Sequence, residues 1–189
     1  MRVISYFTKN TPYENEVDEW LNSFKHCKTA VFTMENQESW EKNCALKCLV
    51  IKKALEDYKD NLLFVDIDAR CMREFEELPQ EDLPGLSWWQ PPYPGMSEEL
   101  LSGTIFIPNN DAGKYLVNTW ILYQKANPKI WDQHVLQHVV QNKNIPHFRL
   151  NHIWIAVNGH IEIENPIIYH HQKSRKYKTL VNLNNQLIQ

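Results

Sequence analysis

The chain has 189 residues, of which 43% are hydrophobic and 23% charged, as expected for a single globular domain. A formal charge of −3 gives no electrostatic basis for non-specific binding of nucleic acid. No apolar stretch approaches the roughly 20 residues that cross a bilayer, and the first residues lack a signal peptide's apolar core. We therefore expect no membrane span and a cytoplasmic location. The four cysteines form no paired CxxC units, so a structural zinc site is not expected.

The N-terminal third alternates predicted strands and helices. In chain order they are strand 3–7, helix 13–24, strand 30–34, helix 43–58 and strand 62–65. The first helix is expected to place on one face Val17, Trp20, Leu21 and Phe24. This order predicts a parallel sheet covered by helices, as in nucleotide-binding folds. Because no Gly-rich phosphate loop follows the first strand, the phosphates of a nucleotide would need another anchor.

The rest of the chain predicts a more irregular arrangement. Five of the ten prolines lie between residues 79 and 95, which predicts a long structured loop. Beyond it we predict strand 101–108, helix 111–125 capped by Asp111, helix 131–140, and strand 161–169 broken at Pro166. No internal repeat or linker divides the sequence, so residues 1–189 are predicted to form one domain.

Two aspartates follow the predicted strand 62–65. Asp66 and Asp68 stand at the carboxyl end of a buried strand, where open α/β sheets bind ligands. In extended backbone both side chains point to the same side, and two such close negative charges favour a positive partner. A hard divalent cation held by carboxylate oxygens is the simplest partner. The alternative is a solvated strand end that binds nothing.

Four motifs follow one another along the chain: Asp66 and Asp68, then Ser102-Gly103, then Asp132-Gln133, then His170 followed by Ser174-Arg175. With Thr11-Pro12-Tyr13 and the segments 39–47 and 166–175, this series resembles small nucleotide-diphospho-sugar transferases of the GT-A fold, particularly short ones from phages and bacteria. The resemblance covers residues 3–177. It implies a single α/β domain with a mixed, mainly parallel sheet flanked by helices. The donor-binding part would be about residues 1–70 and the acceptor or closing part about 71–178.

The resemblance implies a glycosyltransferase that moves a sugar from a nucleotide-diphosphate donor to a sugar, protein or nucleic-acid-base acceptor. Asp66, Asp68 and His170 would hold Mn²⁺ or Mg²⁺, with His171 as the alternative to His170. The donor would contact Lys47, Asp66, Ser102, Gly103, Lys173, Ser174 and Arg175. The short chain leaves few residues for an acceptor subdomain, so the acceptor site is expected to be shallow or to be completed by a second subunit.

Asp132 and Gln133 are the implied catalytic residues, beside the transferred sugar or the acceptor. Asp132 has a simpler alternative role, because aspartate commonly caps a helix at its amino terminus. The nearby His134 and His138 have the spacing of a metal clamp, but we interpret them as an exposed helix face. Donor identity, acceptor identity and the stereochemical outcome stay open.

Other interpretations remain at this point. Haloacid-dehalogenase phosphohydrolases also carry a DxD motif after a hydrophobic strand, but they need a later acidic pair, for which only Glu98-Glu99 is available. A nucleotide-sugar-binding protein without turnover would keep the same pocket. The aromatic residues Trp88, Trp89 and Tyr93 either stack on an acceptor sugar or pack within their own loop.

Overall fold

The computed structural model describes residues 1–75 and 82–186. Within these residues the main sheet has six strands in the order β2-β1-β3-β6-β5-β7. Its strands are β1 (Arg2–Thr8), β2 (Thr29–Met34), β3 (Leu62–Val65), β5 (Gly85–Trp89), β6 (Glu99–Ile107) and β7 (Phe148–Arg149). The pairs β1–β2, β1–β3 and β5–β7 are parallel, while β6 runs antiparallel to β3 and β5. The predicted mixed, mainly parallel sheet is confirmed.

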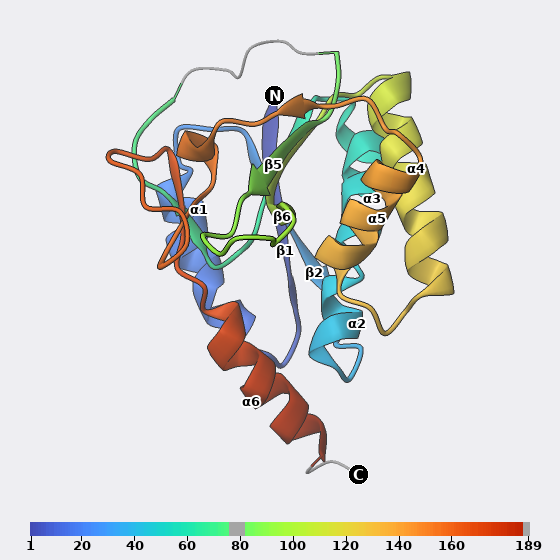
Figure 1. The fold of residues 1–189 in the computed structure, drawn as a ribbon. Coiled ribbons are helices and arrows are strands. Elements are labelled where there is room, and N and C mark those ends of the chain that lie inside the picture. Colours follow the sequence, from blue (N-terminus) through green and yellow to red (C-terminus); the bar gives the residue numbers. More distant parts are fainter. Residues whose placement is uncertain (76–81, 187–189) are drawn as a thin grey trace.

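Helices cover both faces of this sheet (Figure 1). The helices α3 (Lys47–Tyr58), α4 (Asp111–Ala126) and α5 (Asp132–Asn142) lie together on one side, and α1 (Val17–Ser23) lies on the other. The remaining helices are η1 (Pro12–Glu16), α2 (Trp40–Cys44), η2 (His152–Trp154) and α6 (Ser174–Gln186). In the described residues a second, three-stranded sheet contains β4 (Ala69–Cys71), β9 (Ile168–His170) and β8 (Ala156–Val157).

Strand β3 shows why the sheet is buried on both faces. Alternate residues of a strand point to opposite faces. Leu62 and Phe64 pack in the cluster under α3, α4 and α5, whereas Leu63 and Val65 pack in the cluster that contains Trp20 of α1. All four β3 side chains are fully buried. The continuous apolar run ends with the strand at Val65, and the polar Asp66 follows it.

Several predicted helices differ from the structure in detail. The helix predicted over 13–24 begins as the 3-10 turn η1 and continues as α1, and the prediction for Leu21 was wrong because its side chain is 37% exposed. The helix predicted over 43–58 is divided into α2 and α3. At the break, the Tyr6 hydroxyl donates to the carbonyls of Asn43 and Cys44. A half-buried side chain from β1 thus contacts the backbone where one helix ends.

Other differences concern loops and caps. The cap of α4 is Asn110, whose side chain accepts from the backbone of Gly113, so the prediction of Asp111 was one residue late. The loop predicted over 79–95 contains β5, while its residues 79–81 lie outside the described residues. In the segment predicted as strand 161–169, Ile161 forms an isolated bridge with Val157, and β9 begins only at Ile168, after a left-handed Asn165 (φ 53°) and Pro166.

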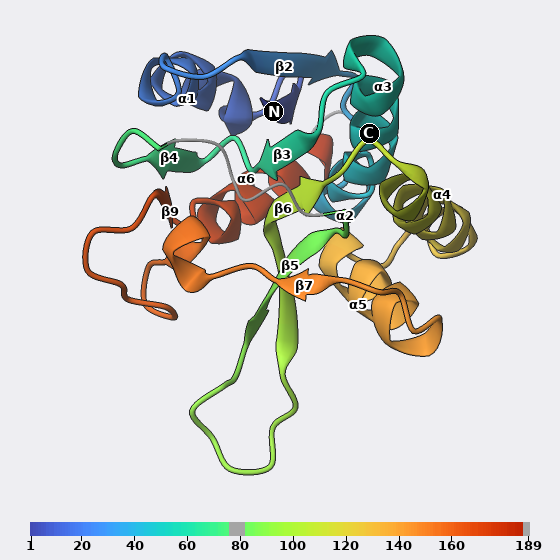
Figure 2. The same cartoon turned by 90° about the horizontal axis from the view of Figure 1, so that it is seen from above.

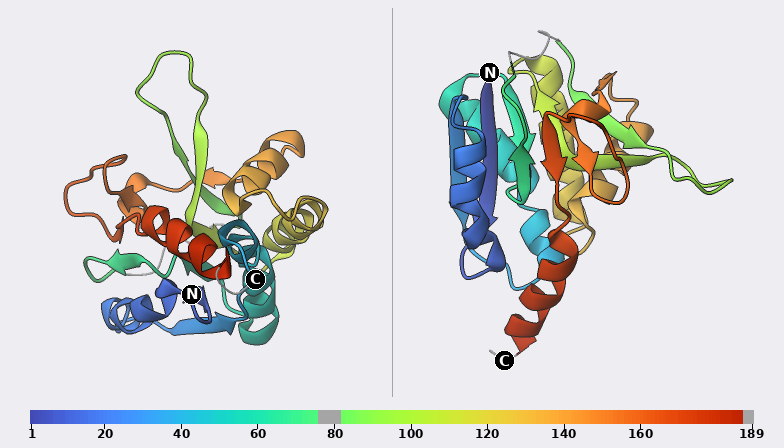
Figure 3. Two further views of the ribbon diagram at one scale, coloured as in Figure 1. Left: turned by 90° about the horizontal axis from the view of Figure 1, so that it is seen from below. Right: turned by 90° about the vertical axis from the view of Figure 1, so that its left-hand side faces the viewer.

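Two parts extend from the body. The loop between β5 and β6 protrudes as a long hairpin (Figure 2), and α6 points away from the sheet in a different direction (Figure 3). Among the described helices, none is long and apolar enough to cross a membrane.

Candidate active site

A cavity of about 440 Å³ opens where β1 and β3 end. Most of the sequence-predicted site residues line it: Lys47, Asp66, Asp68, Ser102, Gly103, Asp132, Gln133, His170, Ser174 and Arg175. They come from α3, the end of β3, β6, the start of α5, β9 and the start of α6. Lys173 and His171 lie outside this lining. Motifs that are more than a hundred residues apart in the sequence therefore meet in one place.

Lys47 is the buried centre of this arrangement. Its Nζ lies 3.0 Å from Asp66 Oδ1 and 2.9 Å from Asp132 Oδ2, and it donates to the Ser102 carbonyl at 3.0 Å. Although burial alone would lower the pKa of Lys47, the carboxylates of Asp132 and Asp66 raise it. The ammonium is therefore charged at neutral pH. Lys47 is therefore a positive partner of Asp66, a role that the sequence analysis had assigned to a metal ion.

Asp132 opens α5 and is 1% exposed. Its Oδ2 accepts from the Ser102 hydroxyl at 3.0 Å as well as from Lys47. Its Oδ1 has no hydrogen-bond partner among the described residues. The capping alternative is wrong, because Trp131 occupies the cap position and no side chain caps this helix. Gln133 accepts from the backbone N–H of Ser102 at 3.4 Å, so both predicted catalytic residues contact β6.

The two aspartates differ in their surroundings. Burial raises the pKa of Asp66 to about 7, against the lowering effect of Lys47. Asp68 is 5% exposed, and its Oδ2 accepts from the backbone N–H of Ser174 at 3.2 Å. Burial also raises the pKa of Asp68, and the Ser174 hydrogen bond opposes that shift. The amino terminus of α6 is thus bound directly to the second aspartate of the motif.

His170 is buried against a glycine. Its Nε2 lies 2.9 Å from Thr104 Oγ1, and burial lowers its pKa to about 3, so the imidazole is neutral. A Cβ on Gly103 would lie 2.6 Å from His170 Cε1, 2.9 Å from its Nδ1 and 3.3 Å from Asp66 Oδ2. Only glycine therefore lets this ring and this carboxylate approach β6 together. His171, the alternative, is exposed and packs its ring edge against Tyr169.

A divalent ion fits these residues only with additional ligands. In the part of the chain that the structure describes, no group of three or more His, Cys, Asp or Glu side chains is arranged to hold a metal. The chemistry of Asp66, Asp68 and His170 nevertheless suits Mn²⁺ or Mg²⁺. The hydroxyl of Thr104 contacts Nε2 of His170, which leaves Nδ1 as the ring nitrogen for a ligand. Oxygen atoms of a bound ligand would have to complete the shell.

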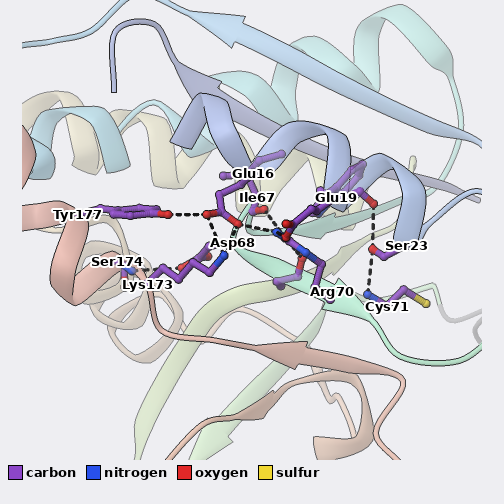
Figure 4. A network of polar contacts seen from close by, with 12 residues as sticks. Glu16, Glu19, Ser23, Ile67, Asp68, Arg70, Cys71, Lys173, Ser174 and Tyr177 are labelled. Atoms are coloured by element: carbon purple, nitrogen blue, oxygen red, sulfur yellow. Dashed lines mark hydrogen bonds and ion pairs between the residues drawn. The ribbon is translucent and has the colours of Figure 1, made fainter. Parts of the chain in front are cut away.

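A second polar network lies beside the cavity, around Glu16 (Figure 4). Glu16 is 3% exposed and accepts from Lys173 at 2.9 and 2.7 Å, from Arg70 at 2.5 Å and from the Tyr177 hydroxyl. Burial alone would raise the pKa of Glu16, but Lys173, Tyr177 and Arg70 lower it. Lys173, expected at the diphosphate, thus binds η1 instead. The network attaches the start of α6 to the N-terminal part of the chain.

The sequence missed an aromatic wall of the cavity. The Trp40 indole N–H donates to the Tyr13 hydroxyl at 3.1 Å, and the rings of Trp40 and Trp131 lie 5.4 Å apart. Trp131 could have been identified from the sequence, because it directly precedes the predicted catalytic residue Asp132. Trp40 stands in the segment 39–47 that contributed to the resemblance, but no site role was assigned to it. His134 and His138 are exposed on α5, outside the cavity, as the sequence interpretation predicted.

No protein-family model matches the chain, and no curated protein matches it in sequence. Solved structures do. A glycosyltransferase involved in the glycosylation of the major capsid of PBCV-1 is 14% identical with a TM-score of 0.67, covering 95% of this chain and 98% of its own. GlyE from Streptococcus pneumoniae TIGR4 is 13% identical with a TM-score of 0.60, covering 99% of this chain, which spans 62% of that protein. Mouse xyloside xylosyltransferase 1 is 12% identical with a TM-score of 0.56, and the match covers 90% of this chain and 97% of that protein. At these identities the likeness establishes the fold, and this chain has the GT-A-like glycosyltransferase fold predicted from its sequence.

Proposed function

We propose that the protein is a metal-dependent glycosyltransferase that moves a sugar from a nucleotide-diphosphate donor to an acceptor. The observation that carries this proposal is the meeting of Asp66 and Asp68 with Asp132 and His170 in one cavity at the carboxyl end of β3. The glycosyltransferase fold favours it over a phosphohydrolase. A cytoplasmic location and an oligomeric state stay predictions.

The donor diphosphate is assigned to the end of the cavity near α6. Asp66, Asp68 and His170 would hold Mn²⁺ or Mg²⁺ together with diphosphate oxygens. Such an ion stabilises negative charge on a departing phosphate. Ser174 begins α6, and helix amino termini bind phosphate through backbone N–H groups. Arg175, whose guanidinium now contacts His160 at 2.9 Å, would offer its planar set of donors to the same group.

In the transfer, the oxygen of an acceptor hydroxyl bonds to the anomeric carbon of the donor sugar. The bond from that carbon to the diphosphate oxygen breaks, and its electron pair leaves with the diphosphate. The hydroxyl proton passes to a base, for which we propose the carboxylate of Asp132. We assign Asp132 to this centre, because Lys47 and Ser102 fix its Oδ2 while Oδ1 lacks a partner within the described residues. Gln133, held against β6, would orient the transferred sugar.

The test is Mn²⁺-dependent stabilisation by a panel of nucleoside diphosphates, measured as thermal melting. A ligand at 100 times its dissociation constant adds about 2.7 kcal/mol. For a chain of this size that corresponds to a rise in Tm of about 5–10 °C. Asp68→Asn should abolish this rise, whereas Asp111→Asn, an exposed control at the start of α4, should keep it.

Equal stabilisation of the Asp68 variant and the parent would refute the assignment. Hydrolysis of nucleotide sugars in the presence of Mn²⁺ then separates an enzyme from a binding protein without turnover. Release of inorganic phosphate without cleavage of a sugar would instead indicate the phosphohydrolase class.

A further inference from the structure

The cavity continues along one face of β6, beyond the residues assigned above. Alternate residues of a strand share a face, and Glu99, Leu101 and Gly103 all line the cavity. Gly103 lies against Asp66 and His170. Glu99 lies four residues earlier, which is about 13 Å along the strand. The same wall therefore runs from the proposed diphosphate end to a separate, distant part of the cavity.

The three aromatic residues that the sequence analysis considered for stacking on a sugar have different environments in the structure. Trp88 is buried, and its indole N–H donates to His147 Nε2 at 3.2 Å. Tyr93 is 67% exposed on the protruding loop between β5 and β6. Trp89 lines the cavity. Trp89 is therefore the member of this set that is positioned to contact a substrate.

Trp89 and Glu99 are direct partners across the antiparallel pair β5–β6, so their side chains are neighbours on one face. The Trp89 side chain packs against the cluster of Ile155, Val157 and Ile161, and its ring lies 4.9 Å from the His160 ring, so its position is fixed. Among residues 1–75 and 82–186, no hydrogen bond or ion pair involves the Glu99 carboxylate. The adjacent Glu98, by contrast, binds Arg149 at 2.7 and 2.6 Å.

We propose that Trp89 and Glu99 form the acceptor subsite and that the acceptor is a carbohydrate. A sugar ring presents a face of C–H groups, which packs on an indole, and hydroxyl groups, which donate to a carboxylate. Phosphates of a nucleic acid would be repelled by Glu99. Asp132 lines the same cavity, so an acceptor hydroxyl and the assigned reaction centre share one space. This inference rests on the proposed glycosyltransferase function.

Saturation-transfer NMR with a panel of methyl glycosides of common hexoses and pentoses tests the subsite without any donor. We expect at least one glycoside to bind the parent protein. Trp89→Ala and Glu99→Gln should each raise its dissociation constant at least about 10-fold, through loss of the stacking surface or of a charge-assisted hydrogen bond. Trp89→Phe should bind more tightly than Trp89→Ala, because it keeps an aromatic face.

Two matched controls accompany these variants. Glu98→Gln makes the same chemical change one residue away, on a side chain that binds Arg149, and Tyr93→Ala removes an exposed ring of the same hairpin. Both should bind the glycoside like the parent. Absence of glycoside binding in the parent, or equal losses in controls and test variants, would overturn the subsite while Asp68-dependent nucleotide binding still stood. Glycoside binding as expected, with no nucleoside diphosphate bound, would support the carbohydrate site and overturn the proposed function.

Discussion

Replacing Glu16 with Gln should loosen the start of α6 and weaken donor binding together. The amide keeps the size of the side chain but removes the charge shared by Lys173, Arg70 and the Tyr177 hydroxyl. Arg70 keeps a second partner in Glu19 at 2.6 Å. The substitution therefore weakens mainly the interactions that hold α6.

The magnitude follows from burial. Removing one partner of a buried ion pair costs about 3–5 kcal/mol. The Lys173 side chain is 35% exposed and Arg70 retains Glu19, so we expect about 2–3 kcal/mol for Glu16→Gln. In a chain of this length that lowers Tm by about 4–12 °C. Nucleoside diphosphate binding should weaken as well, because the Ser174 N–H that binds Asp68 lies beside Lys173.

The assay combines thermal melts, calorimetric titration of a nucleoside diphosphate with Mn²⁺, and hydrogen exchange of residues 174–181. Glu19→Gln is the matched control, because Glu19 also binds Arg70 but is 68% exposed and does not contact α6. That variant should lose much less stability than Glu16→Gln, because exposed ion pairs contribute little. Equal destabilisation of both variants, or unchanged exchange at the start of α6, would refute the reasoning.

The same residue predicts a pH dependence. Lys173, Tyr177 and Arg70 hold the pKa of Glu16 below its ordinary value, although burial alone would raise it. Its stabilising contribution is therefore fully present above the unfolded pKa, about 4.3, and is lost as pH falls through the lower folded value. The gap in Tm between parent and Glu16→Gln should close as pH falls from about 5 to 3. A gap that persists at the lowest pH would contradict this.

Three further variants test the cavity. Asp132→Asn should bind donor almost normally but transfer sugar at least about 100-fold more slowly, the lower range for losing one acid–base group, and near-parental turnover would remove Asp132 from the reaction centre. His170→Ala should weaken Mn²⁺-dependent nucleotide binding much more than His171→Ala in the same titration, and the reverse ranking would move the role to His171. Gly103→Ala should displace the His170 ring, cost about 1–3 kcal/mol in a urea melt and reduce nucleotide binding; unchanged binding would separate His170 from the metal.

Local patterns predicted the sheet and the place of the aspartates. The run Leu62–Val65 is apolar on both faces because the strand has a cluster on each side, and its end places Asp66 at the cavity. Such information lies within a few neighbouring residues. Helical periodicity alone was not sufficient for Leu21. Its spacing places it on the same face as Trp20 and Phe24, but those two side chains are fully buried and Leu21 is 37% exposed.

Partners between distant segments could not be predicted. The resemblance implied a phosphate contact for Lys173, yet its side chain binds Glu16, 157 residues earlier. Nothing near Glu16 in the sequence indicates that a buried carboxylate will meet α6. Likewise, Trp89 and Glu99 become neighbours through the register of the β5–β6 hairpin. These pairings depend on how whole helices and strands pack against one another. The sequence around any one of the residues does not reveal that packing.

The sequence and the structure suggest different positive partners for the two aspartates of the cavity. Sequence reasoning placed a cation between Asp66 and Asp68 to offset their repulsion, whereas the structure supplies Lys47 beside Asp66. Lys47 is shared, however, because Asp132 binds the same ammonium. Asp68 accepts a neutral backbone N–H, and His170 is uncharged. Within residues 1–75 and 82–186 no ion pair involves Asp68, so a divalent ion entering with the diphosphate would find its uncompensated carboxylate on that side of the cavity. Lys47 thus offsets the charges of Asp66 and Asp132 in the absence of ligand, and it leaves the electrostatic basis for the proposed metal at Asp68.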